Sequence, residues 1–240
     1  MSSKFAVFDI DGTLIRWQLY HAVVDRMAKL GHLGLDAHEK LHIERMKWKR
    51  RESPGAFLEY EQFLVKLYES VLDKLDPRVF DRIAREIAYE YKDQVYTYTK
   101  NLLNKLKQKG YFCLAISGSH HELVGLVAKD HGFDDWIGSI YHRAAGKFTG
   151  NKQVSSHDKA STLKSLIKKH QLNLKNSYAV GDTASDVGML AMVENPIAFN
   201  PNSELLDHAK NNGWPLVIER KNVVYELKYL GGKYQLANPN

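Results

Sequence analysis

From residue 111 onward, short apolar runs alternate with segments long enough to form helices. The apolar runs are residues 111–116, 137–142, 177–180, 196–199 and 215–219, and the segments suited to helices are residues 121–131, 157–170, 185–193 and 203–212. Strands separated by segments of this length form βαβ units, in which the strands run parallel. Residues 5–8 add one more buried strand near the start of the chain. The sequence therefore predicts an α/β fold with a doubly wound parallel sheet.

The segment between the first strand and this alternation has a different character. Residues 17–93 carry almost no strand signal, and their apolar side chains recur at helical spacing. This pattern predicts a helical bundle inserted into the α/β core, which it would cover as a cap. The predicted division is an α/β core of residues 1–14 and 96–231, a helical cap of residues 15–95, and a loose tail of residues 232–240.

Acidic and hydroxyl side chains follow three of the predicted strands. Asp9 and Asp11 come directly after the first strand, Ser117 follows the second, and Asp182 follows the run at residues 177–180. Lys159 lies in the first turn of the helix that precedes this last strand. Ligands of an open parallel sheet bind beyond the carboxyl ends of its strands. We therefore expect these residues to converge on one edge of the sheet.

The carboxylates in this group suit a magnesium site. Neighbouring carboxylates repel each other, and a hard cation between them lets them stay ionised together. Mg²⁺ prefers oxygen ligands in octahedral geometry. Asp9 and Asp182 are the predicted carboxylate ligands, with the backbone carbonyl of Asp11 as a third. Asp186, one helical turn after Asp182, is expected to hold the ligands in place.

The same residues suit the transfer of a phosphoryl group. A carboxylate such as that of Asp9 can attack phosphorus and form an aspartyl-phosphate, which water then hydrolyses. Asp11 lies two residues further along, where it can protonate the leaving alcohol and later deprotonate the attacking water. Lys159, the Ser117 hydroxyl and nearby backbone N–H groups can stabilise the negative charge of the transition state. We therefore expect a phosphatase.

These motifs resemble those of the haloacid dehalogenase (HAD) superfamily. The match consists of Asp9-x-Asp11-Gly-Thr, a strand ending in Ser117-Gly-Ser, Lys159, and Gly-Asp182-x-x-x-Asp186, in the family's order. The helical insert resembles the cap of the phosphoserine-phosphatase-like branch, subfamily IB. The resemblance implies that Asp9 is the nucleophile and Asp11 the general acid and base. It further implies phosphate binding by Ser117, Lys159 and the backbone N–H of Gly118, metal binding by Asp182 with support from Asp186, and an auxiliary polar role for Ser185.

The sequence also departs from the family's pattern. Phosphoserine phosphatases carry a glutamate nine residues after the nucleophile, which recognises the substrate's amino group, whereas this chain has the uncharged Gln18. The family's Gly-Gly after the serine of the second motif is Gly118-Ser119 here. Both differences argue against phosphoserine as the substrate, and Gln18, Ser119 and Ser185 are candidate pocket residues. The dehalogenase branch lacks the second aspartate of the first motif, so Asp11 argues against dehalogenation.

Composition limits where such an enzyme would act and on what. The formal net charge of +6 favours anionic partners, of which a small phosphorylated metabolite is preferred over nucleic acid. No apolar run approaches the roughly 20 residues needed to cross a bilayer. The start of the chain lacks the pattern of a signal peptide, and the single cysteine, Cys113, cannot form an internal disulfide. We therefore expect a cytoplasmic protein without a membrane partner; the sequence does not determine its oligomeric state.

Parts of the sequence are also compatible with different functions. His38-Glu39-Lys40-Leu41-His42 matches the H-E-x-x-H signature of zinc proteases, with Glu59 or Glu61 as a conceivable third ligand. The basic residues 45–51 could contact nucleic acid or an anionic part of a substrate. The sequence further allows phosphoryl transfer to another alcohol, phosphoserine hydrolysis, and a nucleic-acid-binding or scaffolding role on the same fold.

Overall fold

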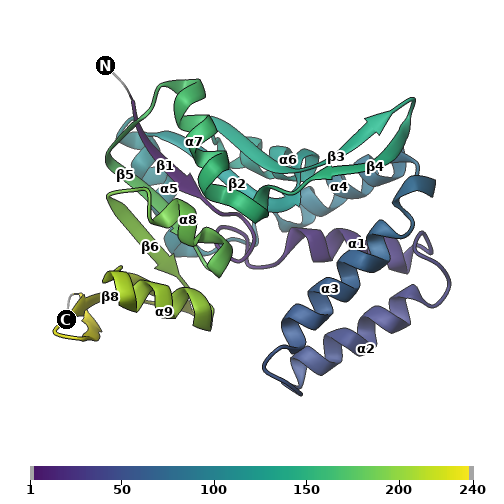
Figure 1. Cartoon of the computed structure of the whole chain (residues 1–240), viewed down its shortest axis with the longest axis horizontal. Coiled ribbons are helices and arrows are strands. Elements are labelled where there is room, and N and C mark those ends of the chain that lie inside the picture. The colour runs from purple at the N-terminus through teal and green to yellow at the C-terminus, as the bar shows by residue number, and fades with distance from the viewer. Residues whose placement is uncertain (1–2, 238–240) are drawn as a thin grey trace.

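A single nine-stranded sheet forms the centre of the computed structural model, which describes residues 3–237. Its strand order is β4-β3-β2-β1-β5-β6-β7-β8-β9. The strands are β1 (Lys4–Phe8), β2 (Phe112–His120), β3 (Asp135–Ala144), β4 (Lys147–Gln153), β5 (Asn173–Gly181), β6 (Asn195–Phe199), β7 (Leu216–Arg220), β8 (Val223–Leu230) and β9 (Lys233–Leu236). The six strands from β3 to β7 in this order pair in parallel, which confirms the predicted fold class (Figure 1).

Nine α-helices accompany the sheet in the described part of the chain. They are α1 (Leu19–Lys29), α2 (Ala37–Lys49), α3 (Ala56–Glu69), α4 (Pro77–Tyr91), α5 (Thr97–Gln108), α6 (His121–His131), α7 (Lys159–His170), α8 (Val187–Leu190) and α9 (Ser203–Asn212). Three short 3₁₀ helices, η1 (Leu72–Lys74), η2 (Ser155–Asp158) and η3 (Ala184–Asp186), complete the set. No described helix is both long enough and apolar enough to cross a membrane.

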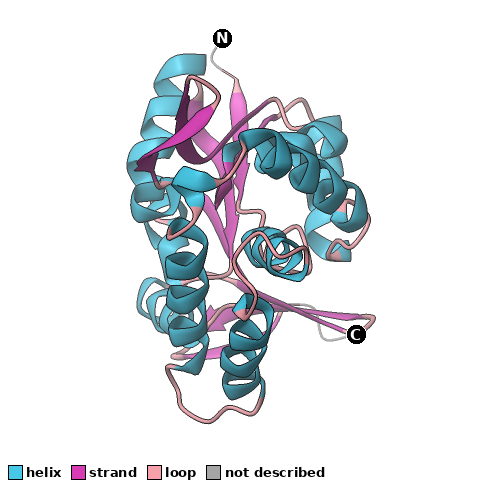
Figure 2. Ribbon diagram, turned by 90° about the vertical axis from the view of Figure 1, so that its right-hand side faces the viewer, coloured by secondary structure: helices cyan, strands magenta, loops and turns pink. Residues whose placement is uncertain are grey.

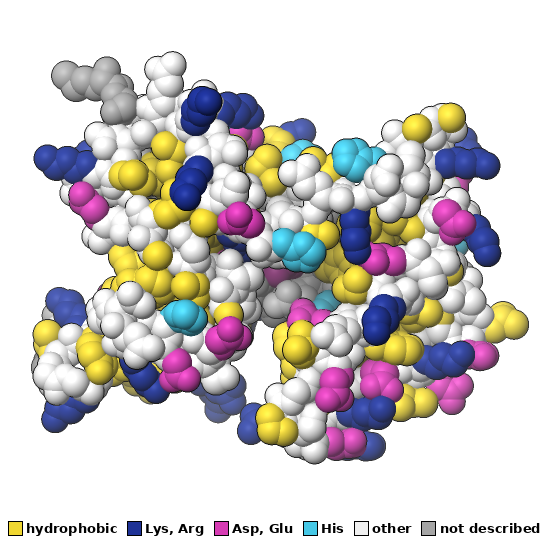
Figure 3. Space-filling model, viewed as in Figure 1, with side chains coloured by type: hydrophobic (Ala, Val, Ile, Leu, Met, Phe, Trp, Pro, Cys, Tyr) yellow, Lys and Arg dark blue, Asp and Glu magenta, His cyan; other side chains and the backbone are white. Residues whose placement is uncertain are grey.

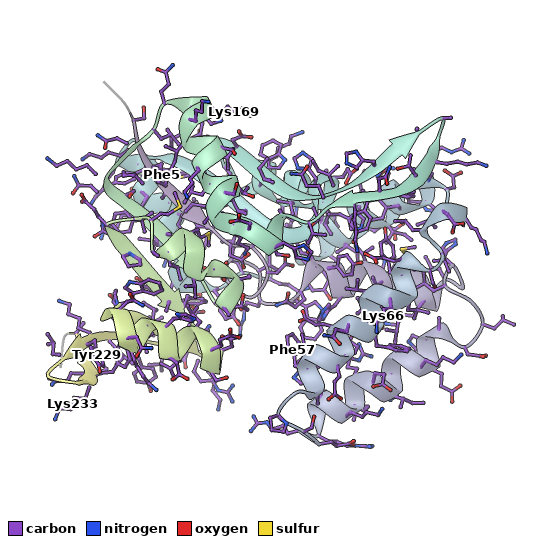
Figure 4. The ribbon with its side chains drawn as sticks, viewed as in Figure 1. Phe5, Phe57, Lys66, Lys169, Tyr229 and Lys233 are labelled. Carbon is purple, nitrogen blue, oxygen red and sulfur yellow. The ribbon has the colours of Figure 1, made fainter. Side chains whose placement is uncertain are left out.

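Three antiparallel strands at the two ends of the sheet were not expected. β4 pairs with β3, and β8 and β9 form a hairpin beyond β7. Tyr229 and Lys233, labelled in Figure 4, mark this hairpin, which carries the sheet away from its parallel part. The prediction of a loose tail from residue 232 was therefore wrong for residues 233–236, which form β9. Residues 238–240 of that tail lie outside the described residues.

The two faces of the parallel sheet are buried beneath different helices. Alternate residues of β1 point to opposite faces, so Val7 joins the apolar cluster under α7, α8 and α9, and Phe8 joins the cluster under α5 and α6. All four residues from Phe5 to Phe8 are fully buried. A strand covered on both faces must be apolar throughout. This explains why β1 has an uninterrupted apolar sequence.

Helices α1 to α4 lie between β1 and α5 along the chain. Asp76 precedes helix α4 and caps it, because its side chain accepts a hydrogen bond from the Arg78 N–H. Pro77 occupies the first helical position. It packs on α1 and on α6, and one apolar cluster runs from the sheet through these helices. Helices α2 and α3 form a pair that projects beside the sheet (Figures 1 and 2). The division at residues 15–95 stays a prediction.

Candidate active site

Asp9 stands directly beyond the end of β1, in the middle of the sheet. Its backbone N–H donates to Val180 O of the neighbouring strand β5 at 2.9 Å, which continues the sheet hydrogen bonding up to this residue. The chain then turns sharply through Gly12, whose φ is +80°. A Cβ atom at Gly12 would collide with the Asp182 carboxylate. The turn thus needs glycine both for its backbone conformation and for the close approach of Asp182.

Lys159 joins two of the aspartates. Its Nζ atom lies 2.6 Å from Asp9 Oδ1 and 2.6 Å from Asp186 Oδ1, and all three side chains are buried. Burial alone would lower the pKa of Lys159, but the Asp186 and Asp9 carboxylates outweigh it and raise the pKa above its ordinary value. Lys159 is therefore a permanent positive charge at this site.

Asp182 completes a cluster of three carboxylates. One oxygen from each of Asp9, Asp182 and Asp186 lies within 4.8 Å of the others. Burial raises the pKa of Asp9 to about 7, and the nearby Asp186 and Asp11 carboxylates add to the rise while Lys159 opposes it. The pKa of Asp182 lies well above its usual range, because of burial and then because of Asp9 and Asp186. Three carboxylates and one lysine leave an excess of negative charge.

The donor set of this cluster fits a hard divalent cation. Asp186 uses its oxygens within the protein: Oδ1 accepts from Lys159, and Oδ2 accepts from the backbone N–H groups of Asp182 and Thr183 at 3.0 and 2.9 Å. Its role is to hold the loop that carries Asp182. Asp9 and Asp182 each have carboxylate oxygens beyond those bonded to Lys159 and to the Thr13 hydroxyl. Oxygen ligands of this kind are those that Mg²⁺ prefers.

Asp11 lies in a separate hydrogen-bond network on the side of the helices. Its carboxylate accepts from the Ser117 hydroxyl at 2.5 Å and from the backbone N–H of Leu19, the first residue of α1. Ser117 in turn accepts from the backbone N–H of Ser119 at 2.9 Å. Ser119 accepts from the backbone N–H of Tyr20 at 3.0 Å. The second strand and the start of α1 therefore meet at the Asp11 carboxylate.

The remaining candidates differ in how close they come to this centre. Gln18 lies against the turn after β1, because a Cβ atom at Gly12 would be 3.3 Å from Gln18 Nε2. Gly118 lies beside Ser156. A Cβ atom at Gly118 would be 3.1 Å from the Ser156 side chain, so a larger residue at position 118 would press on η2. Ser185 is exposed, and its hydroxyl is bonded to that of Thr183 rather than to a carboxylate. Gln18 and Gly118 border the site, and Ser185 lies on its outer side.

Sequence reasoning missed three hydroxyl side chains that shape the site. Thr13 donates to Asp182 Oδ1 at 3.1 Å and so links the first motif to the last. Ser155 donates to the carbonyl of Ser117, and Ser139 donates to the carbonyl of Gly118 at 2.6 Å. Thr13 could have been found, because it lies within the Asp-Gly-Thr motif. The two serines lie in unremarkable sequence and are identified only by their contacts.

The zinc-protease hypothesis finds no support in the fold. His38 is half-buried and His42 is exposed on α2. Within residues 3–237, the only group of three or more histidine, cysteine, aspartate and glutamate side chains arranged to hold a metal is Asp9, Asp182 and Asp186. The histidine pair therefore has no third ligand from Glu59 or Glu61.

The surface is hollowed between the α2–α3 pair and the part of the core that carries α9 (Figure 3). The chain passes from β1 to α1 above this hollow, so the site lies between the sheet and the inserted helices (Figure 1). The arrangement has the parts needed for chemistry on a phosphate: a buried carboxylate, a lysine, a hydroxyl, a second carboxylate and an acidic cluster for a cation.

Comparison with known proteins agrees with this geometry. The family model for haloacid dehalogenase-like hydrolases matches residues 6–191, and the chain belongs to this family. A phosphoserine phosphatase of Methanocaldococcus jannaschii is 25% identical over 230 residues, which cover 95% of this chain and 97% of that protein. A histidinol-phosphatase of Neisseria meningitidis is 26% identical over 222 residues, which cover 89% and 98%. The predicted family and its phosphoserine-phosphatase-like branch are thus confirmed.

Other matches are partial or concern the fold alone. A putative hydrolase of Mycobacterium leprae is 28% identical over 127 residues, which cover 52% of this chain and only 42% of that protein. Among solved structures, a Bordetella pertussis protein of unknown function has a TM-score of 0.71 at 20% identity and covers 91% of this chain and 99% of its own. A phosphoserine phosphatase solved as an analogue of its phospho-aspartyl intermediate has a TM-score of 0.62 at 21% identity. The match covers 92% of this chain and 95% of that one.

Proposed function

We propose that this chain is a magnesium-dependent phosphatase that hydrolyses the phosphate monoester of a small metabolite through a phosphorylated Asp9. The observation that carries the proposal is the position of the Asp9 carboxylate. It is buried at the end of a central strand, with Oδ1 held 2.6 Å from Lys159 and with Asp182 and Asp186 beside it. A carboxylate held in this way keeps Oδ2 for attack on phosphorus.

The reaction has two steps. In the first, Asp9 Oδ2 forms a bond to phosphorus while the bond between phosphorus and the leaving oxygen breaks, and Asp11 gives its proton to that oxygen. In the second, Asp11 takes a proton from water, the water oxygen bonds to phosphorus, and the bond to Asp9 breaks. Asp11 is suited to both because Ser117 and the N–H of Leu19 fix its carboxylate beside the turn that carries Asp9.

Positive charge is the other requirement of phosphoryl transfer. Lys159 supplies one charge, and its contacts with Asp9 and Asp186 keep it at the site. Mg²⁺ held by Asp9 and Asp182, with the Asp11 carbonyl as the further predicted ligand, would neutralise the phosphate charge and so favour attack by a carboxylate. The backbone N–H of Gly118 is a proposed donor to the phosphate oxygens. The Ser117 hydroxyl is the second proposed donor, and for this it turns from Asp11, to which it donates in this structure, towards the phosphate.

The substrate is proposed to be a small phosphorylated metabolite. The relatives named above include enzymes of phosphoserine and of histidinol phosphate, whose substrates are small and carry an amino group. This chain has Gln18 beside the turn after β1, and an uncharged amide does not attract an ammonium group as a carboxylate does. The proposal therefore favours a substrate other than phosphoserine, with a leaving group other than serine.

Replacement of the nucleophile tests the proposed function. The Asp9→Asn variant and the wild-type protein are assayed with Mg²⁺ on a panel of phosphorylated metabolites and on a chromogenic phosphate monoester. We expect kcat to fall at least about a thousandfold in Asp9→Asn, because the amide cannot form the covalent intermediate. Asp207→Asn, an exposed aspartate on α9, is the control and should keep full activity. Undiminished hydrolysis by Asp9→Asn, or no hydrolysis by the wild-type protein, would refute the proposal.

A further inference from the structure

A cavity of about 260 Å³ lies among the inserted helices, apart from the residues of the candidate active site. Residues of α1, α2, α3 and α4 line it, together with Trp17 just before α1. Most of the lining residues are polar or charged, among them His21, Asp25, Arg26, Lys29, Arg45 and Glu90. A cavity with such walls is built for a polar occupant rather than for an apolar one.

Two of the three cations in its wall are already neutralised. Arg26 contacts Glu90 Oε2 at 2.6 Å and Glu86 at 3.0 Å. Lys29 contacts Asp25 Oδ2 at 2.9 Å. The Arg26 pairs connect α1 to α4, and the Lys29 pair lies along α1. Both cations therefore have carboxylate counter-ions.

Arg45, the third cation, shares its counter-ion. Its side chain is one-quarter exposed and forms an ion pair with Asp25 Oδ1 at 3.6 Å, which is too long for a hydrogen bond, and Asp25 also pairs with Lys29. A guanidinium has five N–H donors arranged to bind a carboxylate in two places. Arg45 lines the cavity and its side chain makes no hydrogen bond to any of residues 3–237, so its N–H groups can bind a ligand there.

Two further residues with polar groups, His21 and Tyr60, line the same cavity. His21 is only 4% exposed, and its Nδ1 atom has no hydrogen-bond partner within residues 3–237. Its other nitrogen, Nε2, lies 3.4 Å from Glu61. Tyr60 lies beside it with ring centroids 5.2 Å apart, and burial raises the pKa of Tyr60 to about 12, so that its hydroxyl stays neutral. A buried ring nitrogen without a partner is costly unless a ligand or water bonds to it.

Aromatic side chains of α2 and α3 pack against two of the residues that line the cavity, His21 and Tyr60. The Trp48 ring stacks on Tyr60 at 5.9 Å and lies 4.9 Å from Phe57, which is labelled near the start of α3 in Figure 4. The His21 ring lies 6.0 Å from Phe57. This packing fixes the positions of His21 and Tyr60, so the polar groups are held in place before any ligand arrives.

We propose that this cavity is a second binding site, and that it takes a small carboxylate-bearing molecule of amino-acid size. Arg45 binds the carboxylate, and His21 and Tyr60 complete its hydrogen bonds. The volume corresponds to about nine water molecules at roughly 30 Å³ each, and so to a compound with a similar number of non-hydrogen atoms. Asp25 and Glu90 also line the cavity. Lys29 and Arg26 neutralise them, but a carboxylate can accept several hydrogen bonds, so these two side chains favour a ligand that also carries an ammonium group.

The test measures binding directly and needs no enzymatic activity. L-threonine, isobutyrate and isopropylamine are titrated into the full chain by calorimetry, without Mg²⁺ or phosphate and also in the Asp9→Asn variant. L-threonine has both charged groups, isobutyrate has only the carboxylate, and isopropylamine has only the ammonium. We expect L-threonine to bind. Binding of isobutyrate as well would show that the carboxylate alone suffices, and both results support the proposal.

Variants on α2 and α1 locate the site. Arg45→Gln should weaken binding roughly tenfold or more, because a charged hydrogen bond is lost. Arg50→Gln, the exposed arginine directly after α2, is the matched control and should leave the affinity within about twofold. Ala22→Leu fills the cavity without removing a charge and should also abolish binding. Urea unfolding of each variant confirms that it is folded.

Three results would overturn the proposal. The first is that neither L-threonine nor isobutyrate binds at 10 mM, a concentration set by the experiment. The second is that isopropylamine binds as well as L-threonine. The third is that folded Arg45→Gln and Arg50→Gln have equal affinities. Because each readout is binding in the absence of turnover, a failure here is distinct from a failure of the proposed phosphatase function.

Discussion

At the scale of single residues, Lys159 determines the charge balance of the candidate site. It faces two carboxylates at 2.6 Å, while Asp182 forms no ion pair with a cationic side chain of residues 3–237. A buried ion pair is stable only if each charge is matched, and removal of one partner leaves an uncompensated charge. Burial, and after it the neighbouring carboxylates, raise the pKa values of Asp9 and Asp182. The excess negative charge explains why the site attracts a cation.

His120 is a buried residue whose pKa is lowered rather than raised. It is 1% exposed, and neither ring nitrogen has a hydrogen-bond partner within the described residues. The rings of Tyr141 and Phe80 lie 4.1 and 4.3 Å from it. Burial lowers the pKa of His120 to about 3, with Arg143 adding to the effect. The folded protein therefore binds the imidazole proton less readily than the unfolded chain, whose histidine has a pKa near 6.5.

This difference predicts a loss of stability in acid. Between pH 6.5 and about 3 the unfolded state binds more protons than the folded state, so the free energy of unfolding falls as the pH falls. At pH 5 the loss due to His120 is about 2 kcal/mol. The His120→Phe variant lacks this contribution, and urea unfolding at pH 7.5 and pH 5 measures it. We expect the drop between the two pH values to be about 2 kcal/mol smaller in the variant.

An exposed histidine provides the control. His208 lies on the surface of α9, and His208→Phe should lose as much stability between pH 7.5 and pH 5 as the wild-type protein. Equal drops in the wild-type protein and in His120→Phe would show that His120 is not neutral and buried in solution.

At the scale of elements, helix α5 depends on a residue that is distant in sequence. Glu219 of β7 accepts hydrogen bonds from the backbone N–H groups of Thr97 and Tyr98 at 3.0 and 2.8 Å. These are the first residues of α5, whose own residue before the helix, Tyr96, provides no side-chain cap. A carboxylate at this position satisfies free N–H groups and interacts favourably with the helix dipole.

Glu219→Ala should therefore destabilise the protein. We expect the free energy of unfolding to fall by about 1–2 kcal/mol, the usual cost of removing a cap. Glu219→Gln retains one oxygen acceptor and should lose less. Urea unfolding of both variants measures the difference, with Glu204→Ala on the exposed first turn of α9 as the control. No greater loss in Glu219→Ala than in the control would contradict the capping role.

The strands that sequence reasoning missed are those with little apolar pattern. In β4 only Phe148 is buried, so the strand has no alternation to detect. In β8 most residues are exposed, and Val223, Tyr225 and their neighbours form a hairpin at the edge of the sheet. Edge strands owe their place to hydrogen bonds with a neighbouring strand rather than to burial. A strand that is held by pairing rather than by burial leaves no apolar pattern, so a single sequence does not reveal it.

At the scale of the whole molecule, the acidic cluster and Lys159 join three separate segments: Asp9 follows β1, Asp182 lies in the loop after β5, and Lys159 begins α7. A cation bound there would therefore stabilise the entire core against unfolding. We expect Mg²⁺ at about 100 times its Kd to raise the free energy of unfolding by about 2.7 kcal/mol relative to EDTA. Thermal unfolding in the two solutions measures this difference.

The Asp182→Asn variant tests where the cation binds. It should remain folded, because the Thr13 hydroxyl can still bond to the amide oxygen, yet respond far less to Mg²⁺. Asp207→Asn on α9 should respond like the wild-type protein. Identical unfolding of the wild-type protein in Mg²⁺ and in EDTA would count against a magnesium site in the acidic cluster.

The sequence alone determined the parallel α/β core, the helical insert and the group of residues at the strand ends. Local apolar patterns specify strands and helices, and parallel strands bring their carboxyl ends to one edge. Only the tertiary structure decided which side chains contact each other. Lys159 reaches Asp9 across 150 residues of chain, and Ser117 reaches Asp11 across 106. Such contacts, like the ion pair between Arg45 and Asp25 beside the cavity, depend on the packing of segments far apart in the sequence, which no local pattern encodes.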